Sequence, residues 1–140
     1  MKPPRRSDCP TNYAVEHFGD RWTLLLIRDL LFHGKSYYQE FLSDEEGIST
    51  NILAARLKKM EADGLILRQK ARDGRRIRYV LTDKGIDLAR IMVEINRWSA
   101  KYDPDTGVPA DHSQKIKDDF EGLITDYQRN AVARRAASAD

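Results

Sequence analysis

GISTNILAARLKKMEADGLILRQKARDGRRIRYVL, residues 47–81, is the stretch that decides the fold of this 140-residue chain. Its first half carries apolar side chains at helical spacing: Ile52, Leu53, Leu57 and Met60. Between Ser49, which can cap a helix, and Gly64, which can end one, this spacing predicts an amphipathic helix. Its second half alternates apolar and polar residues around Asp73 and Gly74, and an Asp-Gly turn predicts a β-hairpin because both positions tolerate positive φ. A helix followed directly by a hairpin predicts a recognition helix with a wing.

Three shorter helices are predicted before this stretch. Residues 11–18 form a helix with one apolar side, and Gly19 is placed to end it in the left-handed conformation. Residues 21–32 are nearly all apolar and predict the central helix of the core, with Asp20 as its cap. Ser36 can cap a third helix that extends to Leu42. Short helices ahead of the amphipathic one complete a helix-turn-helix pattern.

Two longer helices are predicted after the hairpin. Thr82 can cap a helix with a wide apolar stripe that continues through Trp98, and a proline- and glycine-containing segment ends it. A last helix covers about residues 112–135. The fold class is therefore mainly α with a small β-hairpin, a winged helix-turn-helix with additional N- and C-terminal dimerisation helices. We divide the chain into a basic flexible arm (1–10), the winged helix-turn-helix DNA-binding domain (11–103) and a C-terminal extension with a dimerisation helix (104–140).

Positive charge is concentrated on the predicted hairpin. Residues 68–78 hold six cations against one anion, a net charge of +5, although the whole chain carries a formal net charge of only +2. The cations are Arg68, Lys70, Arg72, Arg75, Arg76 and Arg78. Such a local excess on a near-neutral protein predicts an anionic partner, and double-stranded DNA is the partner that a wing would meet. The alternative is a solvated strand pair whose cations only prevent edge-to-edge aggregation.

The recognition helix and the wing supply the predicted DNA-contacting residues. At the helix N-terminus, Ser49, Thr50 and Asn51 can meet phosphates or base edges, and the amide of Asn51 can read adenine. Later cations of the same helix are Arg56 and Lys58. The wing residues that can bind phosphates or enter the minor groove are Arg72, Arg75, Arg76 and Arg78. The alternative for the helix is ordinary core packing with solvated cations on its outer face.

Three runs of the sequence together resemble one family. They are CPTNYAVEHFGDRWTLLLIRDLLFHG (9–34), GISTNILAARLKKMEADGLILR (47–68) and RYVLTDKGIDL (78–88). In combination these runs resemble the HxlR-type winged helix-turn-helix regulators, a group related to MarR-like proteins, over about residues 9–98. Members are small bacterial or archaeal dimeric repressors or activators. The resemblance implies that this chain is also a dimeric, sequence-specific regulator of transcription.

The motif positions of that family are matched in most places. They comprise a Cys-Pro pair near the start, a tryptophan motif in the second helix and an Arg-Leu pair in the recognition helix. The matching residues are Cys9, Pro10, Asp20, Trp22, Ile27, Arg56 and Leu57. The Pro or Arg that usually follows the opening Ser is replaced by Thr50 and Asn51, which implies a different operator sequence and not a different class of protein.

Cys9 is the single cysteine of the chain. In some HxlR-type members a cysteine near the N-terminus senses oxidants or electrophiles, so the resemblance implies a redox sensor at Cys9. Arg5 and Arg6 would lower the pKa of its thiol, whereas Asp8 would raise it. The alternative is a small apolar packing residue. Without a second cysteine, any disulfide would join Cys9 to the partner chain or to a small thiol.

Apolar residues on the first helix and on the last two predict a dimer interface. They are Tyr13, Ile91, Ile95, Trp98 and Phe120. A two-fold pairing would cover this surface and present two recognition helices to a pseudo-palindromic operator, with half-sites about one helical turn or a multiple of it apart. Aromatic residues at such an interface can also line a site for a small-molecule effector. The alternative is a monomer whose tail folds back on its own domain.

Other classes of protein find little support in the sequence. No apolar run is long enough to cross a bilayer, and the basic start lacks a following apolar segment, so we expect a cytoplasmic protein with no membrane partner. One cysteine and three scattered histidines favour no metal site. We expect no cofactor and no enzyme activity, because neither a phosphate-binding glycine loop nor a catalytic pair occurs. The alternative to a regulator is a winged-helix protein-interaction module without DNA specificity of its own.

Overall fold

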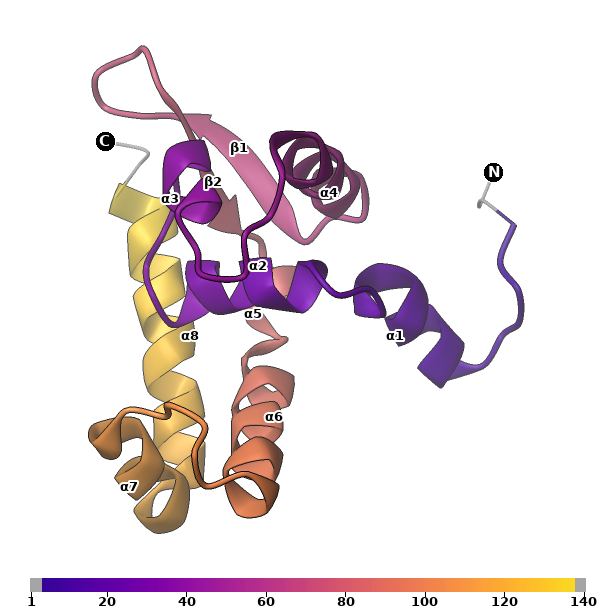
Figure 1. Ribbon diagram of the computed structural model, residues 1–140. Helices are drawn as coiled ribbons and strands as arrows, with labels where there is room; N and C mark the ends of the chain where they lie inside the picture. The colour runs from indigo at the N-terminus through magenta and orange to yellow at the C-terminus, as the bar shows by residue number, and fades with distance from the viewer. Residues whose placement is uncertain (1–3, 138–140) are drawn as a thin grey trace.

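The computed structural model describes residues 4–137. Its elements are α1 (Pro10–Phe18), α2 (Thr23–Leu31), α3 (Tyr38–Leu42), α4 (Thr50–Ala62), β1 (Ile66–Lys70), β2 (Ile77–Leu81), α5 (Asp83–Ile86), α6 (Ala89–Tyr102), α7 (Ala110–Asp118) and α8 (Phe120–Ala137). Figure 1 shows α4 and the β1–β2 hairpin at one end of the molecule and α7 at the other, with α8 running from one end to the other. The expected fold class, mainly α with a small β-hairpin, is confirmed.

The core is built around α2, as its apolar sequence predicts. Ile27 and Leu31 on α2 are almost completely buried, and α4 adds Leu53 and Leu57. The last helix belongs to the same core, because α8 packs against α2, β2 and α6 of its own chain. Its buried residues are Leu123, Ile124 and Ala131. Each fully buried aliphatic side chain of this kind contributes about 1.5–3 kcal/mol of hydrophobic stabilisation.

The wing is an antiparallel pair in which Ile66 faces Leu81 and Lys70 faces Ile77. Beyond that pair Ala71 N–H donates to the carbonyl of Arg76 at 2.8 Å, and Gly74 N–H donates to the carbonyl of Ala71 at 2.9 Å. Gly74 has a φ of 70°, whereas no residue other than glycine has a positive φ within residues 4–137. The predicted hairpin is confirmed, but of the two positions that tolerate positive φ only Gly74 adopts it. A longer loop allows an ordinary turn followed by one left-handed glycine.

The predicted cap of α4 is confirmed, because the Ser49 hydroxyl accepts a hydrogen bond from Ile52 N–H at 3.3 Å. The predicted cap of α2 is not, because Trp22 and not Asp20 is its N-cap residue. Asp20 Oδ1 nevertheless accepts from Trp22 N–H at 2.8 Å and from Thr23 N–H at 3.0 Å, in the turn that leads into α2. Gly64, with a φ of 77°, ends the α4 segment in the left-handed conformation. These local caps fix where the recognition helix begins and ends.

Two other predicted helix ends are wrong. Gly19 has a φ of −78°, and its N–H donates to the carbonyl of Val15, so α1 ends in a right-handed turn. Ser36 does not cap α3, because Tyr37 is the N-cap residue. The Glu40 carboxylate instead accepts from the N–H groups of Ser36 and Tyr37. The carbonyl of Ser36 accepts from Tyr79 N–H of β2 at 2.8 Å, so this residue joins the edge of the sheet.

Both helices predicted after the hairpin are interrupted. The first divides into α5 and α6, where Leu88 N–H donates to the carbonyl of Gly85 in a tight turn. Gly85 packs against β1, since an added Cβ would lie 2.2 Å from the carbonyl oxygen of Leu65. The second divides into α7 and α8 at Asp119, whose Oδ1 accepts from Gly122 N–H at 3.1 Å. An Asx cap inside the predicted helix therefore starts a new one.

Candidate nucleic-acid interface

The N-terminus of α4 is the first part of the candidate interface. Ser49, Thr50 and Asn51 are all exposed, and Ser49 uses its hydroxyl as the helix cap. The side chains of Thr50 and Asn51 have no hydrogen-bond partner within the part of the chain that the structure describes. Tyr38 Oη donates to the carbonyl of Thr50 at 2.9 Å, which fixes this end of α4 against α3. The exposed backbone N–H groups of the first turn carry the positive end of the helix dipole, which favours phosphate.

Arg56 and Lys58, both predicted DNA contacts, lie in different environments on α4. Arg56 Nε donates to Asp20 Oδ1 at 3.0 Å and thereby links α4 to the turn before α2. Although burial opposes it, hydrogen bonds from Thr23, Trp22 and Arg56 hold the pKa of Asp20 at about 2. Lys58 is exposed, with no ion pair to any residue from 4 to 137. Lys58 therefore stays available to a ligand, whereas Arg56 positions the helix.

The tip of the wing carries cations in an exposed loop. Arg72 and Arg75 are exposed, and neither guanidinium has a protein partner among residues 4–137. Arg76 Nε is 2.9 Å from Asp73 Oδ2, and its guanidinium lies 4.2 Å from the centre of the Tyr37 ring. Hydrogen bonds from the backbone N–H groups of Arg76 and Arg75 hold the pKa of Asp73 at about 2. Asp73, the single anion of the loop, is therefore ionised, and its negative charge offsets the positive charge of Arg76, its ion-pair partner.

Arg78 differs from the other predicted wing residues because its side chain runs toward α8. Its Nη2 donates to the carbonyl of Arg134 at 3.1 Å, and its Nε is buried without a partner in the described chain. The predicted wing contacts are thus brought together only in part. Arg72, Arg75 and Arg76 lie at the tip, whereas Arg78 anchors the base of the wing.

The wing tip and α4 lie at the same end of the molecule (Figure 1). This arrangement, a helix N-terminus beside a cationic hairpin, has the geometry with which winged helix-turn-helix proteins engage the major groove and the flanking backbone. A family model of the HxlR-like helix-turn-helix matches residues 17–106, which include α2 to α6. The chain belongs to the HxlR-like helix-turn-helix family. Like its relatives, it is a DNA-binding transcriptional regulator.

Relatives and solved structures agree with this assignment. YvaP of Bacillus subtilis (strain 168), an uncharacterised HTH-type transcriptional regulator, is 35% identical over 96 residues, which are 67% of this chain and 88% of YvaP. The crystal structure of PA1607 has a TM-score of 0.67 and 34% identity, and the match covers 74% of this chain and 73% of PA1607. The oxidised form of the redox regulator HypR has a TM-score of 0.60 and 26% identity over 66% of this chain and 96% of HypR.

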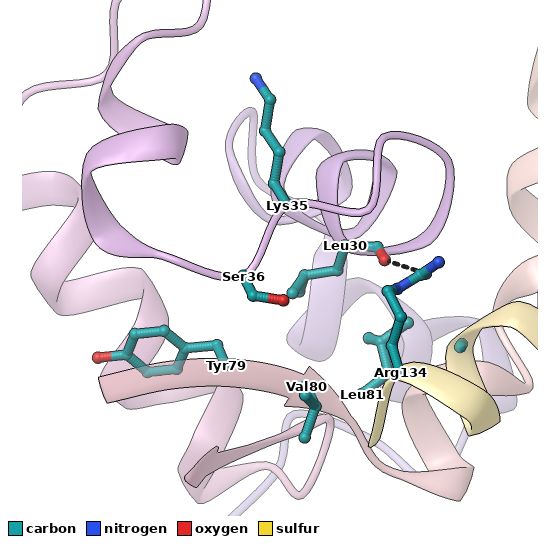
Figure 2. A pocket seen from close by; sticks show the side chains of 8 residues that line it. Leu30, Lys35, Ser36, Tyr79, Val80, Leu81 and Arg134 are labelled. Carbon is teal, nitrogen blue, oxygen red and sulfur yellow. Dashed lines mark hydrogen bonds between the residues drawn. The ribbon is translucent and has the colours of Figure 1, made fainter. Parts of the chain in front are cut away.

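The HxlR-like chain continues past the matched segment, and its end holds the DNA-binding elements in place. Arg134 Nη2 donates to the carbonyls of Leu30 at 2.7 Å and Leu31 at 3.3 Å at the end of α2, and Figure 2 shows the first of these bonds. Arg135 donates to the carbonyl of Leu81 at the end of β2. Neither role is predicted by the sequence, where the only local signal is the Ala-Arg-rich end of the last helix.

The predicted dimer residues of this HxlR-like protein divide into two groups. Tyr13, Ile91 and Trp98 are 45%, 40% and 66% exposed, which is unusual for large apolar side chains. Ile95 and Phe120 are partly buried against the core of their own chain, and the Arg97 guanidinium covers the Phe120 ring at 4.0 Å. Further exposed residues on the same two helices, α1 and α6, are Val15 and Tyr102.

Cys9, the predicted redox sensor, is exposed and is the N-cap residue of α1. The backbone N–H groups of Asn12 and Thr11 at the start of α1 lower the pKa of its thiol. The cause is therefore the start of the helix, and not the arginines that the sequence offered for this effect. Arg5 does not act on the thiol in the expected way, because its Nε is paired with Asp8 Oδ1 at 3.0 Å.

Two further findings concern the described part of this regulator. No helix within residues 4–137 is both long and apolar enough to span a membrane. In the same residues no cluster of three or more His, Cys, Asp or Glu side chains is placed to hold a metal ion. His112 is buried, and its contacts are to aromatic and amide groups.

Proposed function

We propose that this regulator binds a pseudo-palindromic operator as a homodimer, with one α4 N-terminus in the major groove of each half-site. The observation that carries the proposal is the pair of uncompensated guanidinium groups, Arg72 and Arg75, at the same end of the molecule as the exposed start of α4. A wing that held its cations only for solubility would not need them at the tip of a loop beside a helix N-terminus. Binding of this kind either represses or activates transcription, according to where the operator lies.

The residues at this surface have different roles in the proposal. Asn51 reads a base edge, because its amide is exposed and uncommitted at the start of α4. Arg72, Arg75 and Lys58 bind phosphates as exposed cations. Arg56 and Arg78 act indirectly, because Asp20 holds the first and the carbonyl of Arg134 holds the second. Direct readout therefore depends on fewer residues than the number of cations suggests.

The homodimer is proposed from the apolar surfaces of α1 and α6. Tyr13 and Val15 on α1, and Ile91, Trp98 and Tyr102 on α6, are exposed in the isolated chain. A two-fold axis that covers these side chains would bury aromatic surface, which is enriched at protein interfaces. It would also place two recognition helices on one face, as a pseudo-palindrome with half-sites about one helical turn apart requires.

The proposal includes a response of DNA binding to oxidants through Cys9. The supporting observations are the exposed thiol, its lowered pKa at the start of α1, and the similarity to HypR, which is a redox regulator. A thiolate at a helix N-terminus reacts faster with oxidants than an unperturbed thiol. The product would be a disulfide to the partner's cysteine or to a small thiol.

Fluorescence anisotropy of the reduced protein tests this function directly. A labelled duplex from upstream of its own gene is titrated at near-physiological salt with excess competitor DNA. Saturable binding that resists competitor, with a mass in light scattering of twice 16.1 kDa, is the expected result. Hydrogen peroxide should change the affinity of the wild type and leave that of Cys9→Ser unchanged. Equal binding to every duplex, with complexes that form only with a protein partner, would favour the interaction-module alternative.

A further inference from the structure

A cavity of about 280 Å³ lies far from the wing tip, between α2, α6, α7, α8 and the segment that connects α6 to α7. Its walls include Phe32, Asn96, Val108, His112 and Tyr127. Three of these five residues follow residue 106, where the family match ends. The cavity is therefore a property of this chain's own C-terminal extension. Its size is at the lower limit for small-molecule sites, which suits a ligand with a single ring.

One wall of the cavity consists of three aromatic rings in mutual contact. The Phe32 ring meets His112 edge-on at 5.3 Å and Tyr127 at 4.6 Å between centroids, and His112 lies 5.6 Å from Tyr127. Such a wall offers ring faces and edges to a planar ligand. His112 is also the only fully buried residue of α7 within the described chain.

A chain of hydrogen bonds runs along this wall. Asn96 Nδ2 donates to His112 Nε2 at 3.2 Å, which places the ring proton on Nδ1, and Nδ1 lies 2.7 Å from Tyr127 Oη. Burial lowers the pKa of His112 and raises the pKa of Tyr127, so both are neutral at pH 7. The Tyr127 oxygen is then an acceptor for His112, and its own proton has no acceptor within residues 4–137. Tyr127 is ready to donate one hydrogen bond to a ligand.

The charge around the cavity favours a neutral ligand. Arg28 reaches this cavity, but its guanidinium donates to the two carboxylate oxygens of Glu46 at 2.7 and 3.1 Å. Its Nη2 also lies 3.0 Å from Asp29 Oδ1 and 3.3 Å from Asp44 Oδ2. A carboxylate ligand would have to displace these partners, whereas a carbonyl needs only the free donor of Tyr127.

The wall residue Tyr127 is linked through α8 to the wing. Arg134 follows Tyr127 by seven residues, about two helical turns, so both side chains lie on the same side of α8. Arg134 binds the end of α2 through its guanidinium, and its carbonyl accepts from Arg78 at the base of the wing. A shift of α8 on ligand binding would therefore be transmitted to the wing.

We propose that this cavity is an effector site for a neutral, single-ring aromatic molecule with a carbonyl acceptor, held by the aromatic wall and by Tyr127 Oη, and that its occupation changes DNA affinity through the Arg134–Arg78 contact. The effect on DNA rests on the proposed function. Binding of the ligand itself does not.

Binding is tested with benzamide as the probe, by isothermal titration and by amide shifts of ¹⁵N-labelled protein, without DNA. Benzamide should bind saturably, and both benzoate and toluene should bind more weakly. Tyr127→Phe keeps the ring and should weaken benzamide about tenfold, the usual cost of one buried hydrogen bond. Tyr102→Phe is the matched control: it also removes a tyrosine hydroxyl, but from a side chain that is 67% exposed, and it should leave the affinity for benzamide unchanged. Val108→Trp should fill the cavity and abolish binding.

Several outcomes would overturn the site. They are the absence of saturable binding, equal affinity of the wild type and Tyr127→Phe, and tighter binding of benzoate than of benzamide. Thermal unfolding of each variant shows whether the fold is kept, and amide shifts that map to the wing tip instead of α7 and α8 would also contradict the assignment.

The link to DNA is tested by anisotropy with and without saturating benzamide. The wild type should change its affinity at least about fivefold. Arg78→Ala should still bind benzamide but lose this effect, because the carbonyl of Arg134 on α8 no longer accepts a hydrogen bond from the base of the wing. An unchanged affinity in the wild type would refute the coupling. A protein that binds benzamide but no DNA at all would contradict the proposed function and leave the ligand site supported.

Discussion

The double substitution Arg72→Ala with Arg75→Ala removes two cations from the tip of the wing, and neither side chain has a protein partner within residues 4–137. Each phosphate contact adds about 0.9 to the slope of log K against log salt concentration, because binding releases condensed counterions. Two contacts per wing and two wings per dimer predict that the slope becomes less steep by roughly 3.6. A fourfold increase in salt would then weaken the wild type by roughly 150-fold more than the variant.

Anisotropy titrations at several salt concentrations between about 50 and 200 mM measure this slope. The matched control is Lys117→Ala with Arg129→Ala, which removes two exposed cations from α7 and α8. The control has the same change in net charge and should keep the wild-type slope. Circular dichroism of both variants shows whether each remains folded.

An unchanged slope in the wing variant would refute the wing–phosphate contact. A decrease of about 1.8, half of the predicted value, would mean that only one wing of the dimer, or a monomer, meets DNA. An equal decrease in the control would show that net charge, and not the position of the cations, determines binding.

Three further perturbations test the fold that supports this surface. Burial, together with Asp44, raises the pKa of Asp29 to about 7, so the free energy of unfolding should fall as the pH rises from about 4 to about 7. Urea unfolding at several pH values should show this decrease in the wild type and lose it in Asp29→Asn. Ser49→Ala should lower the unfolding free energy by about 1 kcal/mol through the lost α4 cap, whereas Ser49→Asp should keep it. Gly85→Ala should lower the free energy of unfolding by about 3 kcal/mol in the same assay, because the new Cβ would clash with the carbonyl oxygen of Leu65.

The helix-turn-helix and its wing could be predicted because their signals are local. The Ser49 cap, the helical spacing that ends at Gly64, and the alternation around Gly74 each act over a few residues. The buried α2 was also predictable, since six of its nine side chains are apolar. In these segments local preference and tertiary packing favour the same structure, so neither overrides the other.

The two helix interruptions were not predicted, because an apolar stripe does not show where a helix stops. The break before α6 lies at Gly85, which closely approaches the carbonyl of Leu65, the residue before β1 and distant from Gly85 in sequence. The break before α8 had a local signal in Asp119, followed three residues later by Gly122, but apolar periodicity on both sides masked it.

The sequence predicts which elements carry the candidate interface, but not which of their side chains have partners within the chain. Arg56 and Arg78 are of the residue type that commonly contacts DNA, yet each forms a hydrogen bond within the chain. Their partners lie 36 and 56 positions away in sequence. No sequence pattern indicates contacts of that range in a single chain. The count of +5 on the hairpin therefore overstates the charge that faces DNA, because one arginine is turned inward and another shares Asp73.

The C-terminal extension bears on how the whole regulator works. Arg134 and Arg135 satisfy carbonyls at the ends of α2 and β2 that would otherwise lack partners at those helix and strand ends. Because α8 also buries Leu123 and Ile124 in the core around α2, the extension cannot move without disturbing the elements that hold α4 and the wing. A chain that ended after α6 would expose this core, and an effector that moves α8 would act on DNA binding through the same contacts. The extension is therefore the part of the molecule in which regulation can differ from that of shorter relatives while the DNA-binding geometry stays the same.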